Sequence, residues 1–243
     1  MPEFFSLHPQ GRAFALFGPS HWAALAAIVA LNIGLSFLRG ARPGLRHNVR
    51  IGLALAIWAA EAGWHAWTLA VGTWDIDYML PLHLCSLLTW LAGLMLLLRD
   101  ARLYYFVNFM GISGGIQYLL TPDFGSYGFP HFRFIQAFTS HGLLVTAAIY
   151  MTVVEGLRPT WTSLKRVLVV TNLYAVGIFF LNPYLGSNYL LLNGKPSSPS
   201  LLDLLPPWPS YIGFLELVGV ASCLLLYAPF AIQDLVKRRQ SAA

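Results

Sequence analysis

Residues 79–98 read MLPLHLCSLLTWLAGLMLLL, a run that contains no Asp, Glu, Lys or Arg. At 1.5 Å per residue, a helix of this length crosses the roughly 30 Å hydrocarbon core of a bilayer. The rest of the chain has the same character: 57% of its 243 residues are hydrophobic and 10% are charged, whereas soluble domains carry about 25% charged residues. This composition excludes an ordinary soluble protein. The basic residues form no dense tract with interleaved aromatics, so we expect no nucleic-acid partner.

Further apolar stretches on both sides of this run are long enough to span a bilayer. We therefore predict an all-α polytopic membrane protein with seven transmembrane helices, in which residues 1–243 form a single helical bundle domain. The predicted spans are 20–38, 51–71, 79–98, 103–120, 132–154, 164–184 and 209–233.

The basic residues divide unevenly between the two sides of this arrangement. Cytoplasmic loops of membrane proteins carry an excess of Lys and Arg, so the richer side is expected to be cytoplasmic. That side holds Arg39, Arg42, Arg46, Arg50, Arg99, Arg102, Arg158, Lys165, Arg166, Lys237, Arg238 and Arg239, and the other side holds Arg12, Arg133 and Lys195. The division predicts seven spans with the N-terminus outside and the C-terminus in the cytoplasm.

Polar side chains inside the predicted spans indicate where function resides, because such groups are costly in hydrocarbon and are functional by default. They are Glu61, His65, His83, Cys85, Gln117, Gln136, Ser140, His141, Asn182 and Glu216. Counted from the outer ends of their helices, Cys85 and His65 lie about 9 Å deep, and His141 and Glu61 about 14–15 Å deep. We expect one polar cavity that opens toward the outer leaflet.

Cys85 is the strongest nucleophile in this set, and it needs a base or a lowered pKa to react as a thiolate. Pro81 is suited to the first turn of a helix, which would place Cys85 about one turn inside. His83 lies about 200° around an ideal helix from Cys85, so His141, from a similar depth, is the better candidate base. Spacing alone leaves this Cys–His pair as one interpretation among several.

Other interpretations of the same residues remain open at this stage. Glu61 and His65 are four residues apart on one helix face, and they can form a structural pair or support a reactive site. A metal site built from His65, His83 and His141 is conceivable, but their spacing does not specify one, and we expect neither a metal nor a cofactor.

Four short motifs resemble those of the bacterial YwaF-type integral membrane proteins, which are similar to the eukaryotic transmembrane-protein-164 acyltransferases. They are PLHLCS at 81–86, GIQYLLTP at 115–122, GFPHFRF at 128–134 and SHG at 140–142. The resemblance extends from about Trp58 to Tyr184, and more loosely over the whole chain. In the family pattern an acidic residue follows the cysteine, whereas this chain has Ser86 there.

The resemblance implies a lipid acyltransferase of the bacterial cytoplasmic membrane, with Cys85 as nucleophile and His141 as base. An acyl chain would pass from a phospholipid, through a cysteine thioester, to a lysophospholipid or another acceptor; water as acceptor would make the site a lipase. We expect supporting roles, toward the oxyanion or the lipid headgroup, from His83, Gln117, Arg133, Gln136 and Asn182, with Glu61 and His65 nearby.

Two further interpretations assign the chain to other classes of protein. In the first, the chain is a transport or binding protein for a small hydrophobic solute, with Glu61 and His65 as a proton-coupled pair. In the second, it is a purely structural assembly protein, which the expected burial of Glu61 argues against.

Overall fold

The computed structural model describes residues 3–11, 13–123, 125–195 and 201–242, and within them every regular element is a helix. Arg12, which entered the orientation argument, lies outside these residues. The chain divides into two compact units, Met1–Trp74 with Leu84–Leu157 and Asp75–His83 with Arg158–Ala243. We call them the first and the second unit and describe each by itself. The expectation of a single domain therefore stays a prediction.

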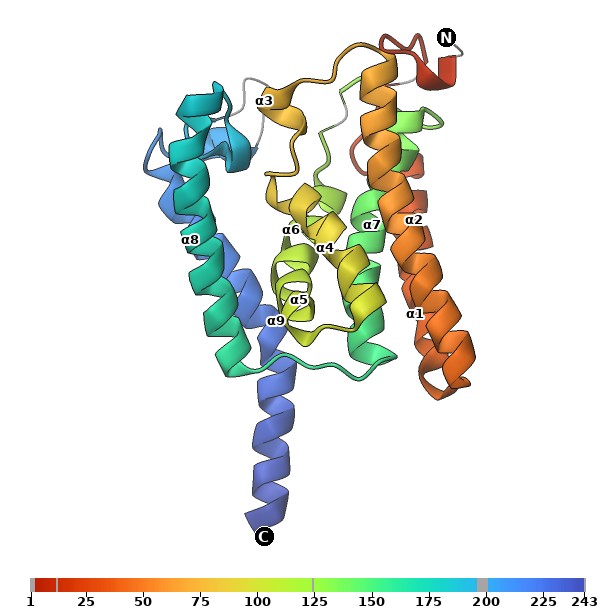
Figure 1. Ribbon diagram of the computed structural model, residues 1–243, viewed down its shortest axis with the longest axis vertical. Helices are drawn as coiled ribbons and strands as arrows, with labels where there is room; N and C mark the ends of the chain where they lie inside the picture. The colour runs from red at the N-terminus through yellow and green to blue at the C-terminus, as the bar shows by residue number, and fades with distance from the viewer. Residues whose placement is uncertain (1–2, 12, 124, 196–200, 243) are drawn as a thin grey trace. The chain divides into compact units, whose positions relative to one another are not determined.

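The first unit is built around α7, which contacts four other helices of the unit, α1, α2, α4 and α6. Figure 1 shows α1, α2 and α7 running alongside one another. Most of α7 is buried, whereas α1 is mostly exposed. The helices of the unit are α1 Pro19–Ser36, α2 Pro43–Ala70, α4 Leu84–Leu98, α5 Ala101–Phe106, α6 Ile112–Leu120 and α7 Phe132–Val153.

A π-helical segment, Val107–Gly111, joins α5 to α6, and all five of its residues are buried. The predicted span 103–120 is thus an interrupted helix that begins at Ala101. Single-turn π segments widen a helix locally and are frequent near functional sites. Small residues follow directly, so α6 can approach its neighbours closely at Gly114 and Gly115.

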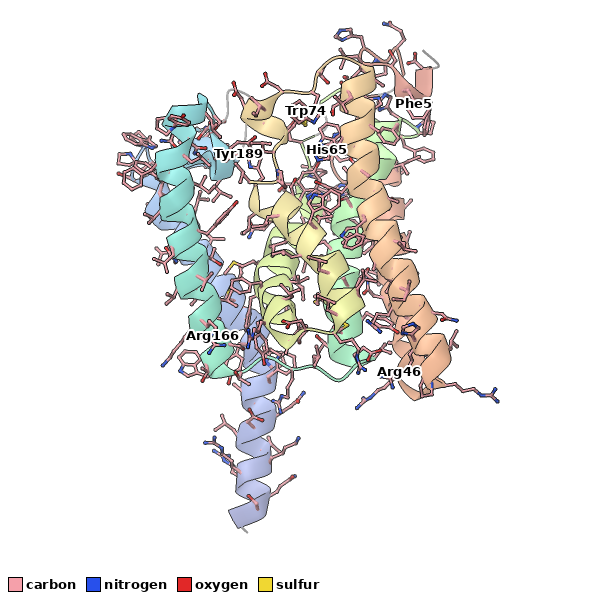
Figure 2. The ribbon with its side chains drawn as sticks, in the orientation of Figure 1. Phe5, Arg46, His65, Trp74, Arg166 and Tyr189 are labelled. Carbon is pink, nitrogen blue, oxygen red and sulfur yellow. The ribbon has the colours of Figure 1, made fainter. Side chains whose placement is uncertain are left out.

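The second unit contains the one-turn helix α3 (Ile76–Met79) and the long helices α8 (Trp161–Leu185) and α9 (Tyr211–Ala242). The side chains of Thr160 and Ser163 form a reciprocal capping box at the start of α8. At the other end, Gly186 adopts φ +70°, the left-handed conformation that commonly terminates helices. Figure 2 shows Arg166 and Tyr189 near opposite ends of α8.

Within the described residues, four helices are long and apolar enough to cross a membrane: Pro19–Gly40, Phe132–Val153, Trp161–Leu185 and Tyr211–Ser241. The other predicted spans correspond to α2, to the 15-residue helix α4 and to the run from α5 to α6. The prediction for 79–98 was too long at its start, because the helix begins at Leu84 rather than at Met79. The count of seven spans and their orientation stay predictions.

Basic residues from the start of α2 and from the turn after α4 meet at one end of the first unit. Arg46 and Arg99 both pair with the carboxylate of Glu155, at 3.3 and 2.8 Å. Figure 2 shows Arg46 at the opposite end of this unit from Phe5, His65 and Trp74. The first unit therefore has a basic end, at Arg46 and Arg99, and an aromatic end, at Phe5 and Trp74.

Candidate functional site

Cys85 is the second residue of α4, where the helix has only just begun. The expectation that Pro81 starts this helix is wrong: Pro81 lies in the turn before it, so Cys85 is in the first turn itself. Its sulfur packs against α6, because a Cβ added at Gly114 would lie 3.2 Å from Sγ. The first four N–H groups of a helix have no acceptor within the helix, so the backbone N–H groups of this turn, including that of Cys85, are not used by helical hydrogen bonds.

Glu61 of α2 is the central polar residue of the first unit, with only 4% of its surface exposed. Its Oε2 accepts a hydrogen bond from Ser140 of α7 at 3.4 Å. Ser86, at the start of α4, presents its hydroxyl to the same carboxylate, and the thiol of Cys85 is close enough to interact with its charge. Oε1 is buried without a hydrogen-bond partner among the described residues. A carboxylate in this setting is expected to be functional.

His141 is held in one orientation by a hydrogen bond and a stacked ring. Its Nδ1 lies 3.0 Å from the carbonyl oxygen of Ala137. A carbonyl only accepts, so Nδ1 carries the proton and Nε2 keeps a lone pair. The ring of Tyr118 stacks on the imidazole with centroids 3.6 Å apart and planes 7° apart. The imidazole is therefore arranged as a base through Nε2.

Helix α6 contacts both proposed reactive residues through adjacent glycines. Gly114 faces the sulfur of Cys85, and a Cβ at Gly115 would lie 3.5 Å from the carbonyl oxygen of His141. In the part of the chain that the structure describes, no hydrogen bond joins the thiol to the imidazole. The residues that flank them, Ser86 and Ser140, both reach Glu61 instead.

Arg133 lies in the first turn of α7 beside this group. Its guanidinium donates to Gln136 Oε1 at 2.5 Å and to the Tyr118 hydroxyl at 3.5 Å. It also lies 3.9 Å from the centroid of Trp64, in cation–π geometry. No carboxylate forms an ion pair with it among the described residues. The site thus contains one cation whose charge is not neutralised by a direct partner.

The profile of the TMEM164 family matches residues 16–227. The chain belongs to the TMEM164 family. Its membership, together with the apolar helices, identifies an integral membrane protein. The resemblance noted in the motifs is confirmed at this level, whereas the narrower bacterial YwaF-type assignment stays a prediction. No curated protein and no solved structure matches the chain.

The matched residues include the helices, from α2 to α7, whose side chains lie near Glu61. Gln136 lies beside α2, where its amide donates to the carbonyl oxygen of Ala60 at 3.1 Å. Arg133, Gln136 and Ser140 follow one another at intervals of three and four residues, and so form one polar stripe along α7. This member of the TMEM164 family therefore places a continuous polar face of α7 against α2.

His65 does not pair with Glu61, contrary to one of the expectations from the sequence. Its Nδ1 instead accepts a hydrogen bond from the indole of Trp74 at 3.2 Å, and Figure 2 shows these two residues close together near the aromatic end of the unit. Gln117 is exposed, and its side chain forms no hydrogen bond among the described residues, whereas its backbone carbonyl accepts one from the Thr121 hydroxyl. Neither side chain is brought to the carboxylate of Glu61.

His83 and Asn182 belong to the second unit and are engaged there. His83 Nδ1 accepts from the backbone N–H of Leu190 at 3.4 Å. Asn182 donates to Tyr189 O and to Asn193 Oδ1, while its own oxygen accepts from Ser187 and from the Tyr189 N–H. Both amide hydrogens of Asn182 are therefore used to shape the loop after α8, and none is left for a substrate.

The aromatic end of the first unit holds the N-terminal segment in place. Trp67, Tyr127 and His131 form hydrogen bonds to three successive carbonyls, those of residues 5, 6 and 7, at 2.9–3.0 Å. Burial raises the pKa of the Tyr127 hydroxyl, which donates one of these bonds. The segment and the side chains that hold it lie next to Arg133, because His131 is the N-cap of α7.

Trp64, Ser86 and Tyr118 are part of this group but were not assigned roles from the sequence. Trp64 lies three residues after Glu61, and so shares its helix face. Tyr118 stands in the motif at 115–122. Helical spacing from Glu61 would have found Trp64, whereas the stacking of Tyr118 on His141 depends on packing between helices. No group of three or more His, Cys, Asp or Glu residues in the described ranges could hold a metal ion.

Proposed function

We propose that the chain is a membrane-embedded lipid acyltransferase that uses Cys85 as its nucleophile and His141 as its base. The observation that carries the proposal is the convergence on Glu61: the neighbours of both residues, Ser86 and Ser140, approach one buried carboxylate. Three helices thereby bring a thiol, an imidazole and a carboxylate into one part of the first unit. Membership of the TMEM164 family supports the membrane setting of this chemistry.

In the first half-reaction, Nε2 of His141 takes the proton of the Cys85 thiol. The thiolate attacks the carbonyl carbon of a phospholipid acyl ester, and a tetrahedral intermediate forms. The carbon–oxygen bond to the glycerol then breaks, and the leaving alkoxide takes the proton back from His141. A lysophospholipid departs, and the acyl chain remains as a thioester on Cys85.

In the second half-reaction, the hydroxyl of an acceptor lysophospholipid loses its proton to Nε2 and attacks the thioester. The carbon–sulfur bond breaks, and the thiolate recovers the proton, which regenerates the starting state. With water as the acceptor, the same steps release a fatty acid. Catalytic hydrogen bonds often shorten only in the complex with substrate, so we include closure of the thiol onto the imidazole as part of the reaction.

The start of α4 offers donors for the negative oxygen of the tetrahedral intermediate. Backbone N–H groups in a first helical turn lack helical acceptors, and Cys85 and Ser86 both belong to that turn. Such donors typically contribute about 10²–10³-fold in rate when aimed at an oxyanion. We assign this role to the backbone rather than to Asn182, whose amide hydrogens are used by its own loop.

Arg133 is the group that we assign to the lipid phosphate. Its guanidinium is fixed by Trp64, Gln136 and Tyr118 but has no carboxylate partner among the described residues. An arginine with free donors recognises phosphate well. By the distribution of basic residues, Arg133 faces the outer leaflet, and we place the site there, in the bacterial cytoplasmic membrane.

The transport alternative relied on Glu61 and His65 as a coupled pair. In the structure, His65 is bonded to Trp74 and Glu61 to Ser140. The arrangement therefore favours the acyltransferase over a proton-coupled carrier.

A transfer assay tests the proposal. Purified protein in liposomes receives a phosphatidylcholine with an isotopically labelled acyl chain and an unlabelled lysophospholipid. We expect the label to appear in the acceptor, and no transfer from the Cys85→Ala protein. Cys223→Ala is the matched control, because that cysteine lies in α9 of the second unit, and it should transfer normally. Equal transfer by the Cys85→Ala and parent proteins would overturn the mechanism.

A further inference from the structure

A groove of about 460 Å³ runs between α1 and α7 in the first unit. Figure 1 shows these two helices alongside each other. Ser20 and Thr139 contribute the hydroxyl groups, and the rest of the lining is alanine, glycine, aliphatic or phenylalanine. The groove is lined by Ser20, Ala23, Ala24, Ala27, Ile28, Leu31, Phe129, Phe134, Ile135, Phe138, Thr139, Gly142 and Leu143.

The groove is separate from the group around Glu61. On α7, Phe134, Phe138 and Gly142 recur every four residues and line it. Gln136 and Ser140, which face α2, lie about 200° around the helix from Phe134 and Phe138 respectively. The groove therefore lies on another side of α7 and does not serve the acyl chain that reacts at Cys85.

Its length corresponds to one leaflet of a bilayer. From Ser20 to Leu31, α1 rises about 16 Å, which is close to half of the roughly 30 Å hydrocarbon thickness. The lining offers two hydroxyl groups and no charged side chain, so an apolar chain that spans one leaflet, such as a lipid acyl chain, matches both its chemistry and its length.

The walls of the groove are shaped by close contact between the two helices. A Cβ at Gly142 would lie only 2.8 Å from Ile28 Cδ1, so the helices touch at this point. The small side chains of Ala23 and Ala27 on α1 and the rings of Phe134 and Phe138 on α7 all line the groove. Inside a bilayer, association depends on van der Waals packing rather than on the hydrophobic effect, and a groove gives a chain more contacts than a convex helix surface.

We propose that this groove binds one acyl chain of a phospholipid from the leaflet at the N-terminal end of α1. The bound lipid is a resident of the protein and not the substrate of the reaction. This proposal is independent of the assignment of Cys85, because it depends only on the shape and lining of the α1–α7 surface.

The test uses a phosphatidylcholine with a photoactivatable diazirine near the middle of one acyl chain, incorporated into nanodiscs with the purified protein. After irradiation, peptide mapping locates the cross-links. We expect them to concentrate on 20–31 and 134–143, at least about fivefold above the exposed lipid-facing residues Val169, Val176 and Phe180 of α8. Uniform labelling of all exposed helix faces would contradict the proposal.

Two neighbouring alanines of α1 provide matched variants. Ala27 lines the groove, whereas Ala26 is exposed on the same helix outside it. Ala27→Trp fills the groove and should reduce its labelling several-fold at unchanged thermal stability, while Ala26→Trp should not. Retained labelling in Ala27→Trp, or cross-links that join α1 or α7 of two copies of the chain, would overturn the single-chain assignment. Cys85→Ala should label like the parent protein, whatever its effect on transfer.

Discussion

Ser140 Oγ lies 3.4 Å from Glu61 Oε2, and this contact ties α7 to α2 one residue before His141. From the other side, Ser86 approaches the same carboxylate one residue after Cys85. The contact matters because no basic side chain forms an ion pair with Glu61 among the described residues. In the reaction that we propose, the negative charge of Glu61 would stabilise the positive imidazolium formed when His141 takes a proton from the thiol.

Glu61→Gln tests the charge of this residue separately from its shape. The amide oxygen still accepts from Ser140, so we expect normal folding and an unchanged melting temperature. Without the negative charge, the imidazolium of His141 loses stabilisation, and the transfer rate should fall at least about tenfold. The measurement is kcat in the liposome assay, with thermal unfolding as a parallel readout.

Glu216→Gln is the matched control for this change. Glu216 lies in α9 of the second unit, where it accepts a hydrogen bond from Asn172 at 2.9 Å. It should transfer acyl chains at the parent rate. If Glu61→Gln also retains the full rate, the carboxylate has no part in the chemistry and only supports the packing of the helices.

Tyr118 is expected to act by holding the imidazole of His141 in place. Tyr118→Phe keeps the stacked ring and loses the 3.5 Å bond from Arg133, so its rate should stay within about threefold of the parent. Tyr118→Ala frees the imidazole to rotate, and displacement of a catalytic group by about 1 Å can cost 10²-fold in rate. We expect a loss of that order in kcat with KM little changed, and equal rates for the two variants would refute the positioning role.

Gly114 leaves the space that the sulfur of Cys85 occupies. In Gly114→Ala the new Cβ would lie 3.2 Å from Sγ, so the thiol must shift by a few tenths of an ångström. We expect slower alkylation of Cys85 by a small maleimide and a fall of about tenfold in transfer rate. Gly177→Ala in α8 is the control, because nothing lies within 4 Å of its added Cβ, and it should behave as the parent does. Unchanged alkylation of Gly114→Ala would show that the sulfur lies elsewhere.

The sequence predicted the helical fold well because apolar length and the absence of charge are local properties. It placed α7 and α8 to within a few residues, but it extended the helix before Cys85 by five residues. The start was too early because the uncharged apolar run continues through the turn before the helix, and Pro81 is compatible both with a first helical turn and with the turn before a helix.

The candidate site was predictable only in part. The cost of polar groups in hydrocarbon singled out Glu61, Cys85 and His141, which all lie in the first unit, and their role as one reactive site stays a prediction. The same rule also selected Asn182, whose side chain forms hydrogen bonds to the backbone of Tyr189 in the loop after α8. Burial cost identifies polar residues that need partners but does not say whether the partner is a backbone group, another side chain or a substrate. That distinction depends on packing between helices.

The orientation rests on the division of basic residues between the two sides. A cysteine introduced in the loop from Arg39 to Arg50 should be shielded from membrane-impermeant thiol reagents in intact cells, whereas one near Lys195 should react. The measurement is mass-tag labelling before and after permeabilisation, in a Cys85→Ala, Cys223→Ala background. The reverse pattern would place the site on the cytoplasmic side instead of the outer one.

The most direct measurement is the mass of the intact protein after incubation with its acyl donor. Incubation with a labelled phospholipid in the absence of an acceptor, followed by rapid acid quench and intact-mass spectrometry, should reveal one added acyl chain on Cys85. Hydroxylamine, which cleaves thioesters, should remove it, His141→Ala should form it at least about 10²-fold more slowly, and Cys85→Ala should never form it. Turnover of lipid by the Cys85→Ala protein at the parent rate, or an adduct at another residue, would contradict the account.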